Sequence, residues 1–250
     1  MQDSFVNLDI KDTIASVTFF TPHHNALPTA ILNRLETVLD EVADNRDVNV
    51  VILQSGGDRT FCAGASFNEL IAIDNESKGK NFFMGFAKVI LAMRNCPQPV
   101  IVRVQGKTVG GGVGIAAAAD YCLASTYASI KLSELSIGIG PFVIGPAVER
   151  KMGLSAFSQM TLNAQEFYTP EWAKANGLFA EVLESNEALD ERVAELARHL
   201  AGYNPEALKA AKKIFWEGTE AWQDILKARA ETSGKLVLSQ FTKEKLQSYK

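Results

Sequence analysis

One carboxylate stands out as a residue that could move protons. Glu134 lies between a predicted strand and a turn rich in glycine and proline, and apolar residues flank it. Apolar surroundings raise the pKa of a carboxyl group because they disfavour its charged form. Such a carboxylate can take up and release protons near neutral pH. The alternative is a surface carboxylate at a strand end, and the sequence leaves both interpretations open.

Two stretches of small residues could direct backbone amides at a negatively charged oxygen. Residues 60–65 follow a predicted strand, and residues 110–114 lie between a predicted strand and a predicted helix. Without side chains, backbone N–H groups can approach a ligand closely, and a helix N-terminus favours negative charge. One amide from each stretch, directed at the same oxygen, would form an oxyanion hole. A plain tight turn is the alternative for each stretch taken alone.

Other motifs of enzyme chemistry are incomplete. Residues 110–114 do not fit G-x-G-x-x-G, since Ile115 stands where the third glycine belongs, and no P-loop lysine follows. No G-x-S-x-G nucleophile motif occurs. His23 and His24 lie in a loop without the H-E-x-x-H context, so no metal site is expected.

These segments belong to a chain that alternates strands and helices in its first part. Strands are predicted at residues 5–10, 14–20, 48–54, 100–105, 121–124 and 129–132, the first two as a hairpin, and helices from Pro28, at 78–94 and at 115–119. Beyond Pro146 the pattern is helical almost to the end, with breaks at Pro170, Gly177, Pro205 and Gly218. The expected fold class is therefore α/β, with a helical appendage.

Composition limits the partners. The chain has 250 residues, 47% apolar and 22% charged, with a net charge of −4. No basic stripe suggests a nucleic-acid partner, and no apolar run approaches the ~20 residues of a membrane span. Cys62, Cys96 and Cys122 lack C-x-x-C spacing, which favours buried free thiols in a reducing compartment. With no secretory leader pattern at its start, the chain is expected in the cytoplasm.

Taken in order, the motifs resemble the crotonase (enoyl-CoA hydratase/isomerase) superfamily, with an overall likeness to methylglutaconyl-CoA hydratase-like sequences. The matching segments are residues 24–27 (HNAL), 61–65 (FCAGA), 99–112 (PVIVRVQGKTVGGG), 120–122 (DYC), 133–138 (SELSIG) and 172–178 (WAKANGL). The resemblance implies a spiral of ββα turns at residues 1–195 that carries an acyl-CoA site. It also implies a helical region at 196–250 used in trimerisation, so that copies form trimers or dimers of trimers.

The resemblance also assigns roles to residues. The amides of Ala65 and Gly111 would stabilise a thioester oxyanion, and Glu134 would be the acid and base. Contacts with the substrate and its CoA are implied for Ala26, Ala63, Gly64, Phe67, Gly112, Pro141, Phe241 and Lys243, the last two from a neighbouring subunit. No cofactor is implied beyond the CoA of the substrate.

One departure from the family pattern affects the reaction. Hydratases of this family generally hold a water between two glutamates, and the position of the first is Gly114 here. The turn at residues 141–145 is also altered. One carboxylate can move a double bond by taking a proton at one carbon and returning it at another. Hydration would require Glu134 to work through one water, or a carboxylate supplied by the substrate.

The expected activity is therefore of the hydratase/isomerase type, on a short branched or dicarboxylic enoyl-CoA. Two alternatives stay open. Decarboxylation of a carboxyacyl-CoA needs the same oxyanion hole, and Gly114 is also compatible with a non-catalytic acyl-CoA-binding protein. A second carboxylate across the site, such as Glu69 or Glu149, would favour hydration.

Overall fold

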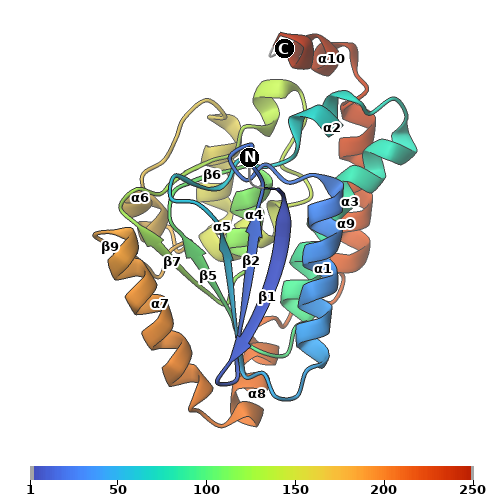
Figure 1. Ribbon diagram of the computed structural model, residues 1–250. Helices are drawn as coiled ribbons and strands as arrows, with labels where there is room; N and C mark the ends of the chain where they lie inside the picture. Colours follow the sequence, from blue (N-terminus) through green and yellow to red (C-terminus); the bar gives the residue numbers. More distant parts are fainter. Residues whose placement is uncertain (1–2, 249–250) are drawn as a thin grey trace.

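A six-stranded sheet lies at the centre of the computed structural model, which describes residues 3–248 (Figure 1). Its strands, in spatial order, are β1 (Phe5–Lys11), β2 (Ile14–Phe20), β3 (Val50–Ser55), β5 (Val100–Val104), β7 (Tyr121–Ser125) and β9 (Glu181–Leu183). β1 and β2 pair antiparallel, which confirms the predicted hairpin, and Asp12 and Thr13 turn the chain with positive φ angles. Every later pairing in this sheet is parallel.

A second, smaller sheet carries the strand ends that were predicted to bear the site. It consists of the parallel strands β4 (Thr60–Cys62), β6 (Lys107–Val109) and β8 (Ser129–Lys131). Each follows a strand of the large sheet along the chain, so the strands advance in pairs from one sheet to the other. This arrangement agrees with the expected spiral of ββα turns.

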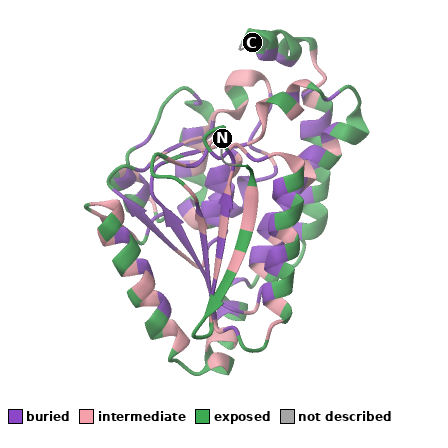
Figure 2. Cartoon of the chain, in the orientation of Figure 1, coloured by how far each residue is buried: buried purple, intermediate pink, exposed green. Residues whose placement is uncertain are grey.

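Helices cover both faces of the large sheet. α1 (Thr29–Asp44), α3 (Glu76–Asn95) and α9 (Trp222–Leu236) lie on one side, and α7 (Asn186–Ala201) lies on the other (Figure 1). α1 buries the apolar face that its periodicity predicts. α7 buries Leu189, Val193 and Ala197 against the sheet, and its remaining residues are intermediate or exposed, pink and green in Figure 2.

Shorter helices complete the chain. They are α2 (Phe67–Ile71), α4 (Gly111–Ala117), the 3₁₀ helix η1 (Glu134–Ile137), α5 (Gly145–Leu162), α6 (Pro170–Ala175), α8 (Pro205–Phe215) and α10 (Gln240–Gln247). None of the helices within residues 3–248 is both long and apolar enough to cross a membrane. The division of the chain at residues 195 and 196 stays a prediction.

Two predicted elements need correction. α4 begins at Gly111 rather than at Ile115, because the glycines that weaken a helix in isolation are here required by close packing. A Cβ on Gly112 would lie 2.7 Å from Cys62 Cβ. The region beyond Pro146 also contains β9, which pairs with β7 at the edge of the sheet. This short strand has no periodicity long enough to separate it from the surrounding helices.

Two glycines allow α3 and α9 to cross at short distance. A Cβ on Gly79 would lie 2.8 Å from Gly234 Cα, and a Cβ on Gly234 would lie 2.6 Å from the backbone nitrogen of Lys80. Real Cβ atoms do not approach other atoms so closely, so the crossing requires glycine on both helices. It brings the residues beside Gly234 against the core.

A buried ion pair ties α8 to the large sheet. Lys212 Nζ lies 2.8 Å from Asp120 Oδ2, and the two side chains are only 4% and 7% exposed. The backbone N–H of Val100 donates to Asp120 Oδ2 at 2.7 Å, and Trp216 Nε1 donates to Asp120 Oδ1 at 2.7 Å. Lys212 also donates to the carbonyls of Met93 and Gln98. Both charges are thus fully surrounded by partners.

Candidate functional site

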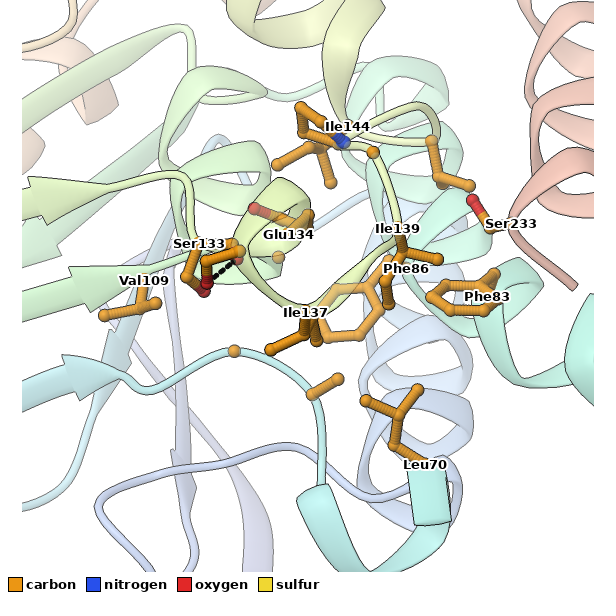
Figure 3. A pocket seen from close by; sticks show the side chains of 18 of the residues that line it. Leu70, Phe83, Phe86, Val109, Ser133, Glu134, Ile137, Ile139, Ile144 and Ser233 are labelled. Atoms are coloured by element: carbon orange, nitrogen blue, oxygen red, sulfur yellow. Dashed lines mark hydrogen bonds between the residues drawn. The ribbon is translucent and has the colours of Figure 1, made fainter. Parts of the chain in front are cut away.

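A cavity of about 290 Å³ opens where the small sheet meets α3, α9 and the turn before α5 (Figure 3). Most of its wall is apolar. Among its lining residues are Ala63, Gly64, Ala65, Phe67, Phe83, Phe86, Gly110, Gly111, Lys131, Glu134, Ile139, Pro141, Ile144 and Ser233. Apolar walls with few polar groups are typical of sites for small organic ligands.

The two small-residue stretches meet at this cavity. A Cβ on Gly64 would lie 3.1 Å from the carbonyl oxygen of Val109 and 3.9 Å from the backbone nitrogen of Gly111. The stretches are therefore in direct contact, although a long helix separates them in sequence. Because both line the cavity, their amides can reach one ligand.

The amides of Ala65 and Gly111 are free to bind such a ligand. Leu27 donates to the carbonyl of Gly64 at 2.8 Å and accepts from the amide of Ser66 at 3.0 Å, which leaves the amide of Ala65 between them unused. In the part of the chain that the structure describes, neither Ala65 nor Gly111 donates its backbone N–H. Two unused donors on one cavity wall are what an oxyanion hole requires.

Glu134 lines the same cavity and lies against Gly110, the residue before Gly111. It begins η1, immediately after β8, and its Oε1 would lie 2.9 Å from a Cβ on Gly110. Only glycine at position 110, with its φ of 53°, allows the carboxylate to approach the turn this closely. The side chain projects into the cavity in Figure 3.

The environment of Glu134 alters its acidity. Its Oε2 is buried and has no hydrogen-bond partner within residues 3–248. Burial raises the pKa of Glu134 to about 7, and only the backbone of Glu134 itself opposes this shift. The carboxyl group can therefore exchange a proton near neutral pH.

Ile144 occupies the space that a side chain at position 114 would need. A Cβ on Gly114 would lie 2.4 Å from Ile144 Cγ2 and 2.5 Å from Ile144 Cβ. Gly114 lies on α4, and Ile144 is the residue that precedes α5. The space that a glutamate side chain at position 114 would need is thus filled by the aliphatic side chain of Ile144.

No second carboxylate faces Glu134 from the described lining residues. Glu69 instead accepts hydrogen bonds from the backbone and the hydroxyl of Thr29, at 2.8 and 2.6 Å, at the start of α1. Glu149 lies on α5 beside a different surface hollow. Both carboxylates that the sequence offered as a second acid are therefore placed elsewhere.

The structure brings most of the predicted site residues together. Glu134, Ala65, Gly111, Ala63, Gly64, Phe67 and Pro141 line the cavity, whereas Ala26, Gly112, Phe241 and Lys243 do not line it within this chain. Gly112 packs against Cys62, and Phe241 packs against Gly138, next to η1. The predicted contacts of these four residues with substrate or CoA stay predictions.

The sequence interpretation missed the residues that give the cavity its apolar walls. Phe83 and Phe86 come from α3, and Ser233 comes from α9 (Figure 3). The aromatic residues belong to an ordinary amphipathic pattern, and Ser233 belongs to no motif. No group of three or more potential metal-binding side chains is gathered anywhere in residues 3–248.

Known proteins resemble this chain over most of its length. The model of the enoyl-CoA hydratase/isomerase family matches residues 9–250. A short-chain-enoyl-CoA hydratase from Clostridium acetobutylicum is 30% identical over 222 residues, which are 88% of this chain and 84% of that protein. The mitochondrial methylglutaconyl-CoA hydratase of Mus musculus is 30% identical over 200 residues, which are 78% of this chain and 63% of that protein.

The fold has close counterparts among solved structures. The crystal structure of an enoyl-CoA hydratase from Bacillus halodurans superposes with a TM-score of 0.90, at 21% identity, over 98% of this chain and all of that one. The spiral fold that the motifs implied is thereby confirmed. From the family match, the sequence relatives and the shared fold, it follows that this chain belongs to the enoyl-CoA hydratase/isomerase family of enzymes.

Proposed function

We propose that this enzyme moves the double bond of a short-chain enoyl-CoA, with Glu134 carrying the proton and the amides of Ala65 and Gly111 holding the enolate oxygen. The observation that carries the proposal is the carboxylate itself. Glu134 has a buried, unpartnered oxygen, lines the same cavity as both free amides, and has no second carboxylate opposite it among the described lining residues.

The proton and electron movements balance with one base. The Glu134 carboxylate takes a proton from C2 of a 3-enoyl thioester, and the electron pair of the C–H bond moves towards the carbonyl. The resulting dienolate places negative charge on the thioester oxygen, where two preorganised N–H donors stabilise it. Protonated Glu134 then returns the proton to C4. The electron pair on oxygen re-forms the carbonyl, and the double bond lies between C2 and C3.

The pKa of Glu134 suits both halves of this cycle. A carboxylate with an ordinary pKa is a weak base towards a thioester α-proton and, once protonated, would lose the proton to water. Burial raises the pKa of Glu134 to about 7, so that the same group is both a usable base and a usable acid at neutral pH. The apolar walls favour retention of the proton between the two steps.

Isomerisation fits the cavity better than hydration. Adding water requires a second group to hold and orient that water, and the position where the family carries it is Gly114, covered by Ile144. The remaining wall is mostly aromatic and aliphatic. The volume of about 290 Å³ supports a short acyl chain, and a branched chain remains part of the proposal.

The decisive experiment compares Glu134→Gln with the native enzyme on a panel of 2-enoyl- and 3-enoyl-CoA esters. Loss of general acid–base catalysis lowers isomerisation by about 10²- to 10⁴-fold, while binding of saturated acyl-CoA persists. The matched control is Glu149→Gln, which removes a carboxylate on α5 outside the cavity and leaves turnover unchanged. Full turnover by Glu134→Gln overturns the proposal.

The same panel separates the alternatives. A 3-hydroxyacyl-CoA product from the native enzyme identifies a hydratase that works with one carboxylate. Carbon dioxide release from a carboxyacyl-CoA, such as a dicarboxylic enoyl-CoA, identifies a decarboxylase. Tight binding of every ester without any product identifies a non-catalytic acyl-CoA-binding protein.

The assembly and surroundings of the enzyme complete the proposal. Exposed apolar side chains on α5 and α8, among them Leu154, Leu162 and Ile214 at 65%, 78% and 62% exposure, support association of copies into trimers or dimers of trimers. Three buried free thiols fit a reducing compartment, so the cytoplasm is the proposed location. No cofactor besides the CoA of the substrate is proposed.

A further inference from the structure

Ser233 places a hydroxyl group in the wall of the cavity, on α9. The residue is only 1% exposed, yet it lines the cavity, and Figure 3 shows it on the opposite side of the lining from Glu134. With the reacting carbons at Glu134, as proposed above, Ser233 would lie beside the space for the far end of the acyl chain. Neither the oxyanion hole nor the proton transfer uses it.

The hydroxyl of Ser233 has no partner among residues 3–248. A serine within a helix commonly donates to the carbonyl four residues earlier. Thr232, its neighbour on the same helix, does so, and its Oγ1 donates to the carbonyl of Ala228 at 3.2 Å. Ser233 makes no such bond, so both its donor and its acceptor capacity remain available at the cavity surface.

The crossing of α3 and α9 holds this hydroxyl in place. Gly234, the next residue, lies against Gly79 so closely that neither position has room for a Cβ. This contact fixes α9 against α3 and turns Ser233 towards the apolar cavity. A hydroxyl placed in an apolar wall without a partner loses hydrogen bonds to water, and a ligand oxygen would restore them.

We propose, on the basis of the proposed function, that Ser233 is a specificity-determining residue that binds a neutral oxygen on the distal part of the acyl chain. The preferred substrates are then acyl-CoA esters with a carbonyl or hydroxyl group beyond the reacting carbons. A distal carboxylate is less suitable, because a neutral hydroxyl does not balance its charge. Lys131, the cation among the described lining residues, instead lies with its Nζ 5.0 Å from the ring centre of Phe167.

Binding of unreactive ligands tests this role without requiring turnover. The probes are matched pairs of saturated esters, 5-oxohexanoyl-CoA with hexanoyl-CoA and 4-oxopentanoyl-CoA with pentanoyl-CoA. The native enzyme binds the oxo member of at least one pair more tightly, and Ser233→Ala reduces that preference by about three- to tenfold. The dissociation constant of the plain member stays within twofold.

Two controls keep the result specific. Thr232→Ala removes a neighbouring hydroxyl that is already bonded to its own helix, and it leaves every ratio unchanged. Glu134→Gln keeps the oxo preference, because binding does not depend on the proton carrier. If Glu134→Gln turns over normally, the proposed reaction fails while the role of Ser233 stands.

Two outcomes overturn the proposal for Ser233. In the first, Ser233→Ala weakens the oxo and plain members equally, which indicates a packing role alone. In the second, no ratio changes in either pair, which indicates that the hydroxyl binds only water.

Discussion

Two buried carboxylates of this chain have opposite surroundings. Asp120 accepts hydrogen bonds from Val100 and Trp216 and lies 2.8 Å from the ammonium group of Lys212. Glu134 has a buried Oε2 with no partner in the described part of the chain, and no cation of the chain balances its charge through an ion pair there. The same functional group is thus fully satisfied at one site and left unsatisfied at the other.

The difference distinguishes a carboxylate with a structural role from the one proposed to carry the proton. The hydrogen bonds and the ion pair of Asp120 join α8 to the sheet. The apolar wall around Glu134 disfavours the charged form and raises its pKa to about 7. Burial alone therefore does not mark a candidate for catalysis in this fold, whereas burial without partners at a cavity supports the proposed role of Glu134.

The largest expected effect comes from removing the satisfied carboxylate. Asp120→Ala leaves Lys212 buried without its counter-ion and also removes the acceptor of Trp216. We expect a loss of about 3–5 kcal/mol in the free energy of unfolding, measured by urea denaturation. The control is Asp74→Ala, which breaks an ion pair whose side chains are 60% and 62% exposed and should cost less than about 1 kcal/mol. Equal losses in the two variants would refute the structural role.

A second prediction concerns the pH dependence of isomerisation. The base must be deprotonated to take the α-proton, so kcat/KM should fall about tenfold per pH unit below the pKa of Glu134 and reach a plateau above it. With the pKa at about 7, the bend should appear near pH 7 rather than near 4.5. A profile from pH 5 to 9 tests this. A flat profile between pH 5 and 8 would show that burial does not shift Glu134 in the working enzyme.

The smallest expected effect is on stability, and its sign is opposite to that for Asp120. The folded pKa of Glu134 is above its ordinary value of 4.5, so the folded state retains a proton that the unfolded chain has released between these pH values. Stability therefore falls as the pH rises from 4.5 to 7. Glu134→Gln removes this loss of about 3 kcal/mol and should raise Tm by up to about 10 °C at pH 8.

The pH series provides its own control. At pH 4.5 and below, glutamic acid and glutamine are both neutral in the folded protein, so the Tm difference should shrink towards zero. Thermal unfolding of the two proteins at several pH values measures it. A lower Tm for Glu134→Gln at pH 8 would mean that the carboxylate has stabilising partners after all.

The amide pair and Glu134 could be placed from sequence because they lie in short motifs at strand ends. Parallel strands that end at the same edge bring such residues together, and the hairpin and the apolar face of α1 follow from local periodicity. The contacts of Ile144 with Gly114 and of Ser233 with the cavity could not be predicted. Each depends on how an element distant in sequence packs against the site. The packing of α9 depends on the close contact between Gly79 and Gly234.

The start of α4 illustrates a different limit. Glycine lowers helix propensity, so the sequence predicts that Gly111 and Gly112 precede the helix. Tertiary contacts reverse that preference, since a Cβ on Gly111 would lie 2.1 Å from a ring carbon of Phe86. The same small residues therefore appear as a helix breaker in the sequence and as the first turn of a helix in the fold.

The contact of Ile144 with Gly114 restricts how this active site can evolve. Glutamate at position 114 alone would collide with Ile144, and a smaller residue at position 144 alone would leave a hole without adding a functional group. Only the two substitutions together would create a second carboxylate opposite Glu134. These positions lie on separate elements, α4 and the turn before α5. Each single substitution should destabilise the fold, one by a collision and the other by a cavity, so a second carboxylate at this place requires two coupled substitutions.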